Sequence, residues 1–423
     1  MNLLDSLQVV SEPDSAPSVA GAGPVGPLGS NTDFAPPSLF SDHESVSLPW
    51  SHLDEWARPI RTDEGNVHEW ESLNWLSLSY ARRVCERDGR WHRLMACGVS
   101  LNHGRNFVSV HQASGASRAK VKGICRCGQT ICCPVCSPRV SAYRASEVAQ
   151  GYKNADGIGF DVYLVTLTAP HYRDSSLLDE ATWWKYSWEW AFRKGKNADA
   201  VKENWIGYVN SAEMTWGERS GWHFHRHLLL AVRPGFGPLC MAQMRARWLA
   251  AVRRGHRDNG GIEQHAFHAV RCDSAAAAWY CSKIGAEMAK PTTKDSFTPL
   301  SLLRKAALER APDAALWYEA LRVCSELKIS SCRWSRGFRA ALGLLPERED
   351  CEIAEDGLVA ADRFLGYVTA DQWRAIIFRR LEYQFLQVAN LGENEANQFL
   401  DAYGLGVLTT SAEYSAIQQK QKQ

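Results

Sequence analysis

Long apolar runs are missing from this 423-residue chain. A membrane-spanning helix needs about 18 or more consecutive apolar residues, and no such stretch occurs, so we expect no membrane partner. The first residues, from Met1 to Asp5, also lack the basic block and the long apolar block of a secretory signal. These two absences predict a cytoplasmic protein.

A strong excess of one charge is also missing, since 48 Lys and Arg residues face 47 Asp and Glu residues and the net charge is +1. Charge is uneven locally. Seven basic residues face one acid between residues 118 and 153, and seven arginines face two acids between 233 and 271. From residue 347 onward, 13 acids face seven basic residues. The two basic stretches flank residues 154–232 and predict a phosphate-binding surface, with solvated helix faces as the alternative.

Internal repeats are absent, and apolar periodicity is scarce in the first 48 residues, which are rich in Pro, Gly, Ser and Ala. We expect a disordered tail over residues 1–48 and a helical segment over 49–96. Strands are predicted over 160–168, 205–215, 223–232 and 262–270, with helices over 137–152, 177–194, 238–254 and 274–290. This order predicts an α+β fold, in which a split-βαβ antiparallel sheet with flanking helices occupies 153–295. Residues 296–423 are predicted to form a helical C-terminal region, including helices over 374–391 and 393–403.

Histidine is scarce, yet three of the 13 histidines alternate between residues 223 and 227. Side chains two positions apart in a strand point to the same face, so these three imidazoles would share one face. Imidazoles arranged in this way can hold a divalent metal ion. The alternative is a strand whose solvent-facing side carries histidines by chance. The spacing favours a metal site that includes His223, His225 and His227.

Thirteen cysteines without a secretory signal indicate a reducing compartment, where closely spaced cysteines bind metal more often than they form disulfides. The segment CRCGQTICCPVC covers residues 125–136. Its Cys-Pro-x-Cys turn places Cys133 and Cys136 on one tetrahedral ion, and Cys127 can close toward it. We therefore predict a structural Zn²⁺ within a small module over residues 97–152. A redox pair at Cys133 and Cys136 fits less well, because redox motifs seldom have further cysteines beside them.

The fourth zinc ligand is open at this point. Cys97, which is followed by a glycine, and Cys125 are the best candidates, and the predicted ligand set takes Cys97. Cys132 and His103 rank behind them. A closed site with four protein ligands would stabilise the fold and carry out no chemistry.

An alanine run opens the segment AAAAWYCSK at residues 275–283, within the helix predicted over 274–290. Tyr280 and Lys283 would share one face of this helix, with Glu287 one turn beyond. A phenol beside a cation is a possible nucleophile with a phosphate contact. A packing tyrosine is the common alternative for this pattern.

Taken together, these motifs resemble the replication initiators of rolling-circle plasmids, within the HUH (His-hydrophobe-His) endonucleases. The ordered set extends from about Cys97 to Leu391 and is more specific than any single motif. The matching segments are Cys127-Gly128 with Cys133-Pro134-Val135-Cys136, Thr166-Leu167-Thr168 with Pro170-His171, Glu213-Met214-Thr215 with residues 221–227, Tyr280 with Lys283, Trp334-Ser335-Arg336-Gly337-Phe338-Arg339 with Leu342-Gly343-Leu344, and residues 347–354 with Trp373.

The resemblance implies a role for each matching site residue. The metal pair falls on His225 and His227, and the acid on the preceding strand, Glu213, is a third ligand. His223 is implied as a further ligand or a DNA contact, and Thr166 and Thr168 lie on the strand beside the site. The nucleophile falls on Tyr280, with Lys283 as its cation. Mn²⁺ or Mg²⁺ is the implied catalytic ion.

Two positions depart from the family pattern. Arg226 stands between the paired histidines, where an apolar residue is usual. It should point to the opposite face of the sheet, so the ligands are unaffected while packing on that face is in question. Ala276 stands where some members have a glutamate that activates water for termination, so Glu287 substitutes for it or termination differs.

The implied function is initiation of plasmid rolling-circle replication in the bacterial cytoplasm. The substrate is origin DNA, single-stranded or extruded as a hairpin, with host helicase and polymerase as further partners. Attack by Tyr280 would form a 5′-phosphotyrosine and a free 3′-OH, and reversal would rejoin the strand. The alternatives are a non-catalytic zinc-containing DNA-binding regulator, a related HUH transposase or relaxase, and a metal hydrolase acting on a small molecule.

Overall fold

The computed structural model describes residues 70–89, 92–102, 105–113, 119–255, 257, 262–272, 296–309, 314–356 and 362–420. These residues all belong to one unit that spans Leu53–Gln423. The tail predicted over residues 1–48 and the helix predicted over 274–290 lie outside the described residues, so both stay predictions.

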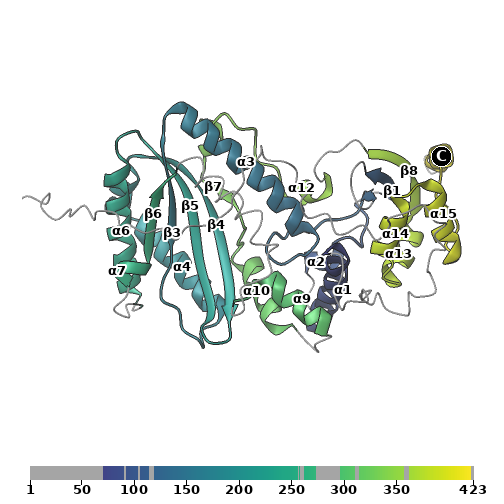
Figure 1. The fold of residues 1–423 in the computed structure, drawn as a ribbon, viewed down its shortest axis with the longest axis horizontal. Coiled ribbons are helices and arrows are strands. Elements are labelled where there is room, and N and C mark those ends of the chain that lie inside the picture. Colours follow the sequence, from purple (N-terminus) through teal and green to yellow (C-terminus); the bar gives the residue numbers. More distant parts are fainter. Residues whose placement is uncertain are drawn as a thin grey trace, which may run out of the picture. The chain divides into compact units, whose positions relative to one another are not determined.

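A five-stranded antiparallel sheet holds the histidine strand (Figure 1). Its order is β6-β3-β5-β4-β7, so β5 is hydrogen-bonded to a neighbour on each side. The hairpin from β4 to β5 ends at Gly221, whose φ of +72° favours glycine, and a side chain there would also meet the backbone of Arg173. The strands are β3 (Asp161–Leu167), β4 (Trp205–Gly217), β5 (Gly221–Val232), β6 (Phe267–Arg271) and β7 (Arg333–Trp334).

Within the described part of residues 137–271, the predicted alternation of strands and helices is confirmed, apart from one boundary. Residues 262–265, predicted to begin the fourth strand, form the short helix α7 (Ile262–His265), closed by the Ala266 N–H donating to Ile262 O at 3.0 Å. The neighbouring strand β3 ends at Leu167, before Pro170, so residues ahead of Phe267 have no strand to pair with there. The helices around the sheet are α3 (Cys136–Ile158), α4 (Leu177–Phe192), α5 (Lys196–Lys202) and α6 (Gly237–Arg254).

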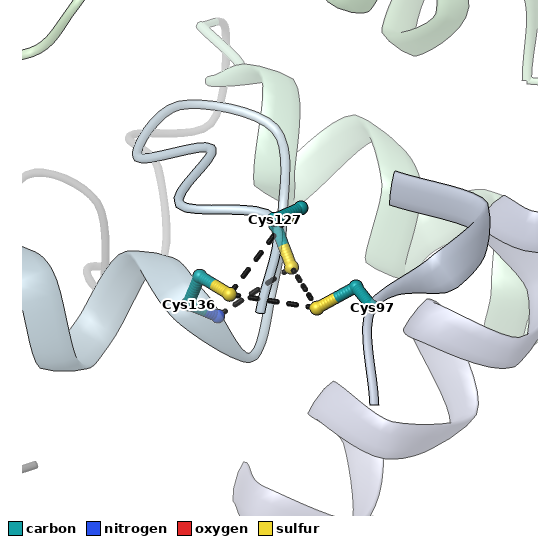
Figure 2. Close-up of side chains that lie close together, drawn as sticks. Cys97, Cys127 and Cys136 are labelled. Carbon is teal, nitrogen blue, oxygen red and sulfur yellow. Dashed lines mark hydrogen bonds between the residues drawn. The ribbon is translucent and has the colours of Figure 1, made fainter. Parts of the chain in front are cut away.

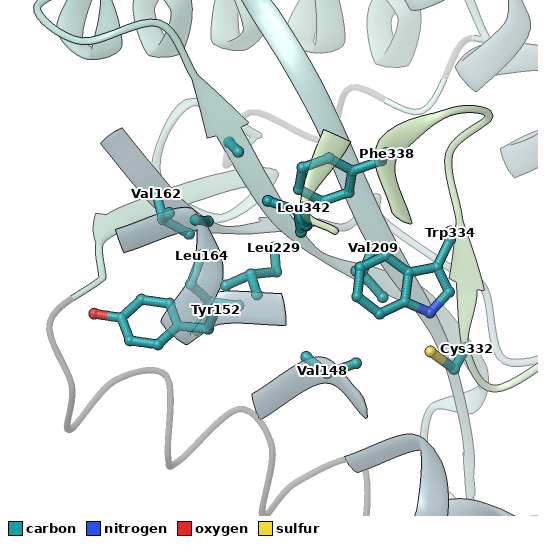
Figure 3. Packing of buried hydrophobic residues seen from close by; sticks show 12 residues of the cluster. Val148, Tyr152, Val162, Leu164, Val209, Leu229, Cys332, Trp334, Phe338 and Leu342 are labelled. Atoms are coloured by element: carbon teal, nitrogen blue, oxygen red, sulfur yellow. The ribbon is translucent and has the colours of Figure 1, made fainter. Parts of the chain in front are cut away.

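Each face of this sheet packs against its own helices. On one face, Trp184 of α4 packs on Phe224 of β5 with ring centroids 6.1 Å apart, and on Trp248 of α6 at 5.4 Å. On the other face, Tyr152 of α3 and Leu229 of β5 belong to one buried apolar cluster that also takes in residues of β3, β4 and β7 (Figure 3). His227 is two residues before Leu229, so the histidines extend this second face beyond the apolar cluster.

A second antiparallel sheet was not predicted. Its order is β2-β1-β8, and it joins β1 (Phe107–Ala113) and β2 (Lys120–Lys122) to the distant strand β8 (Asp362–Thr369). After β8 the region is mainly helical, as predicted. The single helix predicted over 374–391 is wrong, because Arg380 adopts a φ of +58° and separates two helices. The helices after β8 are α13 (Ala370–Phe378), α14 (Glu382–Ala389), α15 (Glu393–Ala402) and α16 (Ser411–Lys420).

Six further helices complete the described chain. None of the helices in the described ranges combines the length and apolar character that crossing a membrane requires. The six are α1 (Trp70–Asp88), α2 (Arg93–Ala96), α9 (Pro299–Glu309), α10 (Ala315–Glu326), α11 (Phe338–Ala341) and α12 (Asp350–Asp356).

Candidate functional site

One carboxylate and two imidazoles converge on the second face of the five-stranded sheet. Glu213 on β4 lies opposite His225 on β5 in the hairpin register. Its Oε2 atom is 2.9 Å from His225 Nε2 and 3.0 Å from His227 Nε2. Both imidazoles are buried and the carboxylate is half-buried. The potential ligand atoms all lie within 4.8 Å of one another, a donor set of nitrogen and oxygen that fits a divalent ion.

The neighbouring strand β3 orients one of these imidazoles. Thr166 pairs with His227 across the β3–β5 ladder, and its Oγ1 is 2.9 Å from His227 Nδ1. When Nδ1–H donates to this hydroxyl, the Nε2 lone pair is left facing Glu213. His225 Nδ1, in contrast, is buried with no hydrogen-bond partner among the described residues. The outer hydrogen bond that usually orients a metal-binding histidine is therefore present for His227.

His223 lies beside this cluster and outside it. Its Nε2 is 2.9 Å from Thr168 Oγ1, and it is not among the three residues whose ligand atoms meet. The His223 ring stacks between His225, at 4.5 Å between centroids, and His171, at 4.6 Å. Burial, followed by the neighbouring imidazoles, lowers the pKa of His223 to about 3, so its ring is neutral near pH 7. His171 was noted in the sequence only as part of a motif, and nothing in its spacing indicated this stack.

The predicted orientation of Arg226 is confirmed. Its guanidinium lies on the face opposite the histidines, 4.6 Å from the centroid of the Trp184 ring, and Nη1 donates to Asn210 Oδ1 at 2.8 Å. Burial lowers the pKa of Arg226 to about 10. The aromatic ring and the amide together accommodate an arginine where an apolar side chain would otherwise pack.

The predicted nucleophile cannot be placed in the same way. Tyr280 and Lys283, together with Ala276 and Glu287, lie outside the described residues. Their roles remain predictions from the sequence.

Four cysteines form a second cluster, in which the sulfur atoms of Cys97, Cys127 and Cys136 point toward one another (Figure 2). Cys97 Sγ is 3.5 Å from Cys136 Sγ and 3.8 Å from Cys133 Sγ, and Cys127 Sγ is 3.7 Å from Cys136 Sγ. All four are buried. A tetrahedral Zn²⁺ with Zn–S bonds of about 2.3 Å holds its sulfurs about 3.8 Å apart, so this spacing fits zinc.

The positions of the sulfur atoms distinguish the candidates for the fourth zinc ligand. Cys97 joins the cluster, whereas Cys125 donates its thiol to Leu101 O at 3.5 Å. Cys132 is fully buried and interacts with the thiol of Cys324. His103 lies outside the described residues. Cys97 therefore completes a set of four neighbouring sulfurs, and its role as a zinc ligand stays a prediction.

Side chains from two distant helices donate hydrogen bonds to backbone carbonyls next to the cysteines. Arg82 on α1 donates to Cys97 O at 2.5 Å, and Trp373 on α13 donates through Nε1 to Gly98 O at 3.0 Å. Gly128 has a φ of +67°, and a Cβ atom there would lie 2.7 Å from the backbone nitrogen of Cys351. The loop after Cys127 therefore requires glycine both for its conformation and for its close approach to α12.

The close packing of the four thiols shifts the pKa values of Cys97 and Cys133 in opposite directions. Hydrogen bonds, led by the one from Cys127, lower the pKa of Cys97. Burial raises the pKa of Cys133. Four buried sulfurs at this spacing need a compensating cation before all of them can be thiolates, and a divalent metal supplies that charge.

Comparison with known proteins gives two relatives. Protein rep from Streptomyces lividans is 25% identical over 358 residues, which cover 65% of this chain and 77% of that protein. A neomycin resistance protein from Streptomyces cyanogenus is 27% identical over 144 residues, covering 28% of this chain and 33% of that protein. No protein family model matches the sequence. No solved structure matches it either. The chain is thus similar to a Rep protein over most of the length of that protein.

Proposed function

We propose that this chain is a plasmid rolling-circle replication initiator of the HUH class, a metal-dependent endonuclease and ligase for single-stranded origin DNA. The convergence of Glu213, His225 and His227 carries this proposal, because one carboxylate and two imidazoles that could hold a divalent ion meet on one face of the sheet. The similarity to protein rep supports the replication role. The name of the second relative indicates resistance to neomycin, and its match covers too little of either chain to be carried over.

Strand order gives independent support. Among β3, β4, β5 and β6, the spatial order is fourth, first, third and second, and all neighbours are antiparallel. Helices α4 and α5 connect the first strand to the second, and α6 and α7 connect the third to the fourth. This is the order that a split-βαβ arrangement of the ferredoxin-like type requires. It puts the two histidines on an inner strand, between the threonine strand and the glutamate strand.

The positions of the residues that flank segment 273–295 are compatible with a nucleophile at Tyr280. Cys272 donates its N–H to Val162 O at 2.7 Å, at the end of β3 remote from the hairpin, and packs against the apolar cluster on the histidine side of the sheet. Phe297 pairs with Trp216 beside the hairpin, at the opposite edge of the sheet. The described residues on either side of this segment therefore lie toward opposite edges of the sheet, and Cys272 packs on the face that carries Glu213, His225 and His227.

The proposed reaction exchanges one phosphodiester for another. The Tyr280 phenol oxygen forms a bond to the scissile phosphorus as it loses its proton, and the bond from phosphorus to the 3′ oxygen breaks. The 3′ oxygen takes up a proton, and the 5′ phosphate stays on the tyrosine. A Mn²⁺ or Mg²⁺ ion held by the Glu213 cluster would supply charge for the phosphate oxygens. Attack by the 3′-OH on the phosphotyrosine reverses these changes and rejoins the strand.

The test is formation of a covalent adduct with single-stranded oligonucleotides that tile the DNA around the gene. With Mn²⁺, the wild-type protein should give an adduct that survives denaturation, and Tyr280→Phe should give none. Tyr172→Phe is the matched control, because Tyr172 is a half-exposed tyrosine in the same domain and should leave the adduct unchanged. Tight binding without any adduct would instead favour the non-catalytic DNA-binding regulator.

We also propose that Cys97, Cys127, Cys133 and Cys136 bind one structural Zn²⁺. The test is the zinc content of purified protein, measured by inductively coupled plasma mass spectrometry. Cys97→Ser should lose the zinc, whereas Cys125→Ser, which changes a nearby cysteine outside the cluster, should keep it. Retention of zinc by Cys97→Ser, or its loss in Cys125→Ser, would contradict this ligand set.

A further inference from the structure

The basic stretch of residues 233–271 was expected to contribute to a phosphate-binding surface. The structure places its longest helix, α6, on the face of the sheet opposite the histidines, where Trp248 packs with Trp184 and Trp184 packs on Phe224. Helix α6 contains four arginines and no acidic residue. These charges have no part in the site proposed above, so they need a separate explanation.

Two of these arginines are held against one tryptophan of α4. The Arg247 guanidinium lies 4.3 Å from the centroid of the Trp190 ring, and the Arg254 guanidinium lies 5.5 Å from it. Arg247 also donates to the carbonyl oxygens of Trp190, at 2.9 Å, and Ala191, at 3.3 Å, at the end of α4. Neither arginine forms an ion pair within the described ranges. Cations at a helix C-terminus are favourable, so these contacts fix the guanidiniums in place without neutralising their charge.

Further exposed side chains extend this surface along α4. Arg193 follows the last turn of α4 and is exposed. Tyr186, which is 64% exposed, lies one turn before Trp190. We call Tyr186, Trp190, Arg193, Arg247 and Arg254 the α4–α6 patch. It combines three arginines with a phenol, and both kinds of side chain bind phosphate oxygens.

We propose that the α4–α6 patch binds the phosphate backbone of duplex DNA next to the nicked strand. This inference rests on the proposed function in taking the substrate to be DNA. The patch is the outward surface of two packed helices on the face opposite the metal cluster, so the strand being cut does not reach it from the site. The two guanidiniums are already in place on the Trp190 ring, which favours fixed contacts with a backbone over stacking of free bases.

The test is the salt dependence of binding to a duplex of about 20 base pairs that carries origin sequence, measured without added Mn²⁺ or Mg²⁺ so that no cleavage occurs. Each lost phosphate contact lowers the slope of log K against log salt by about 0.9, so the double variant Arg193→Ala/Arg254→Ala should lower it by about 1.8. Arg254→Lys, which keeps the charge, should retain most of the slope. The control is Arg374→Ala, which removes an exposed arginine paired with Asp371 on α13 and should leave the slope unchanged.

Two results would overturn the inference. One is an unchanged slope in a double variant that keeps the wild-type melting temperature. The other is a slope that falls for a single-stranded oligonucleotide of the same length and stays constant for the duplex. Because these measurements need no metal and no cleavage, failure of the Tyr280 adduct assay would contradict the proposed function and leave this result standing.

Discussion

Replacing Thr166 with valine tests whether His227 binds a metal ion through Nε2. The hydroxyl of Thr166 is 2.9 Å from His227 Nδ1, and valine keeps the branched shape of the side chain. In the tautomer that presents a lone pair from Nε2, Nδ1–H donates to this hydroxyl. The substitution removes this buried hydrogen bond and its hold on the orientation of the ring.

The expected effect is a 10- to 100-fold loss of metal affinity, the usual cost of removing an outer partner of a metal-binding histidine, or about 1.4 to 2.7 kcal/mol. The measurement is titration of metal-free protein with Mn²⁺, followed by calorimetry or by the electron paramagnetic resonance signal of the free ion.

Thr168 provides a matched control on the same strand. Its Oγ1 is 2.9 Å from Nε2 of His223, which lies outside the three-residue cluster, so Thr168→Val should change the affinity by less than about twofold. An equal loss in both variants would show that His223 is a ligand after all. Full affinity in Thr166→Val, with the fold intact, would refute the assignment of His227.

Two predictions concern stability. Gly128→Ala should lower the free energy of unfolding by at least about 2 kcal/mol, measured by thermal unfolding, and should reduce the zinc content. Alanine is strained at a φ of +67°, and its Cβ would approach the Cys351 backbone. The control is Gly157→Ala, on a helix with open space around it, which should be neutral or stabilising. Burial raises the pKa of Cys332 to about 12 from 9.0, so the unfolded thiol ionises first as the pH rises. The free energy of unfolding should therefore fall above pH 9 by about 1.4 kcal/mol per unit more in the wild type than in Cys332→Ala, and parallel curves would contradict this.

The sequence was sufficient to predict the face of the sheet that each strand residue occupies. The period of two along a strand is local, so the shared face of His225 and His227 and the opposite direction of Arg226 followed from spacing alone. The meeting of Glu213 with both imidazoles also needed the register of the β4–β5 hairpin. That register was not worked out from the sequence, and Glu213 was expected there only because of the resemblance to the rolling-circle initiators.

Pairings between distant segments were not predictable in this way. Nothing near β1 indicates that it pairs with β8, because such a pairing depends on how the whole chain folds. The break at Arg380 was missed for a related reason, since an arginine at positive φ has no local signal. Spacing alone left both Cys97 and Cys125 as candidates for the fourth position, although the prediction took Cys97, and the hydrogen bonds that Arg82 and Trp373 make to Cys97 O and Gly98 O come from distant segments that spacing does not reveal.

The two candidate metal sites lie on different kinds of backbone, so loss of the ion should affect the fold differently at each site. Glu213, His225 and His227 lie on regular strands, and β5 is hydrogen-bonded on both sides, so this site keeps its shape without an ion. Of the proposed zinc ligands, Cys127 lies in a loop and Cys97 follows a single helical turn. Loops of this kind derive their order from the bound metal. A mild chelator that removes only the more weakly held ion should therefore abolish nicking with little change in the melting temperature, whereas removal of zinc should lower it. Equal loss of structure in both steps would contradict this division of roles.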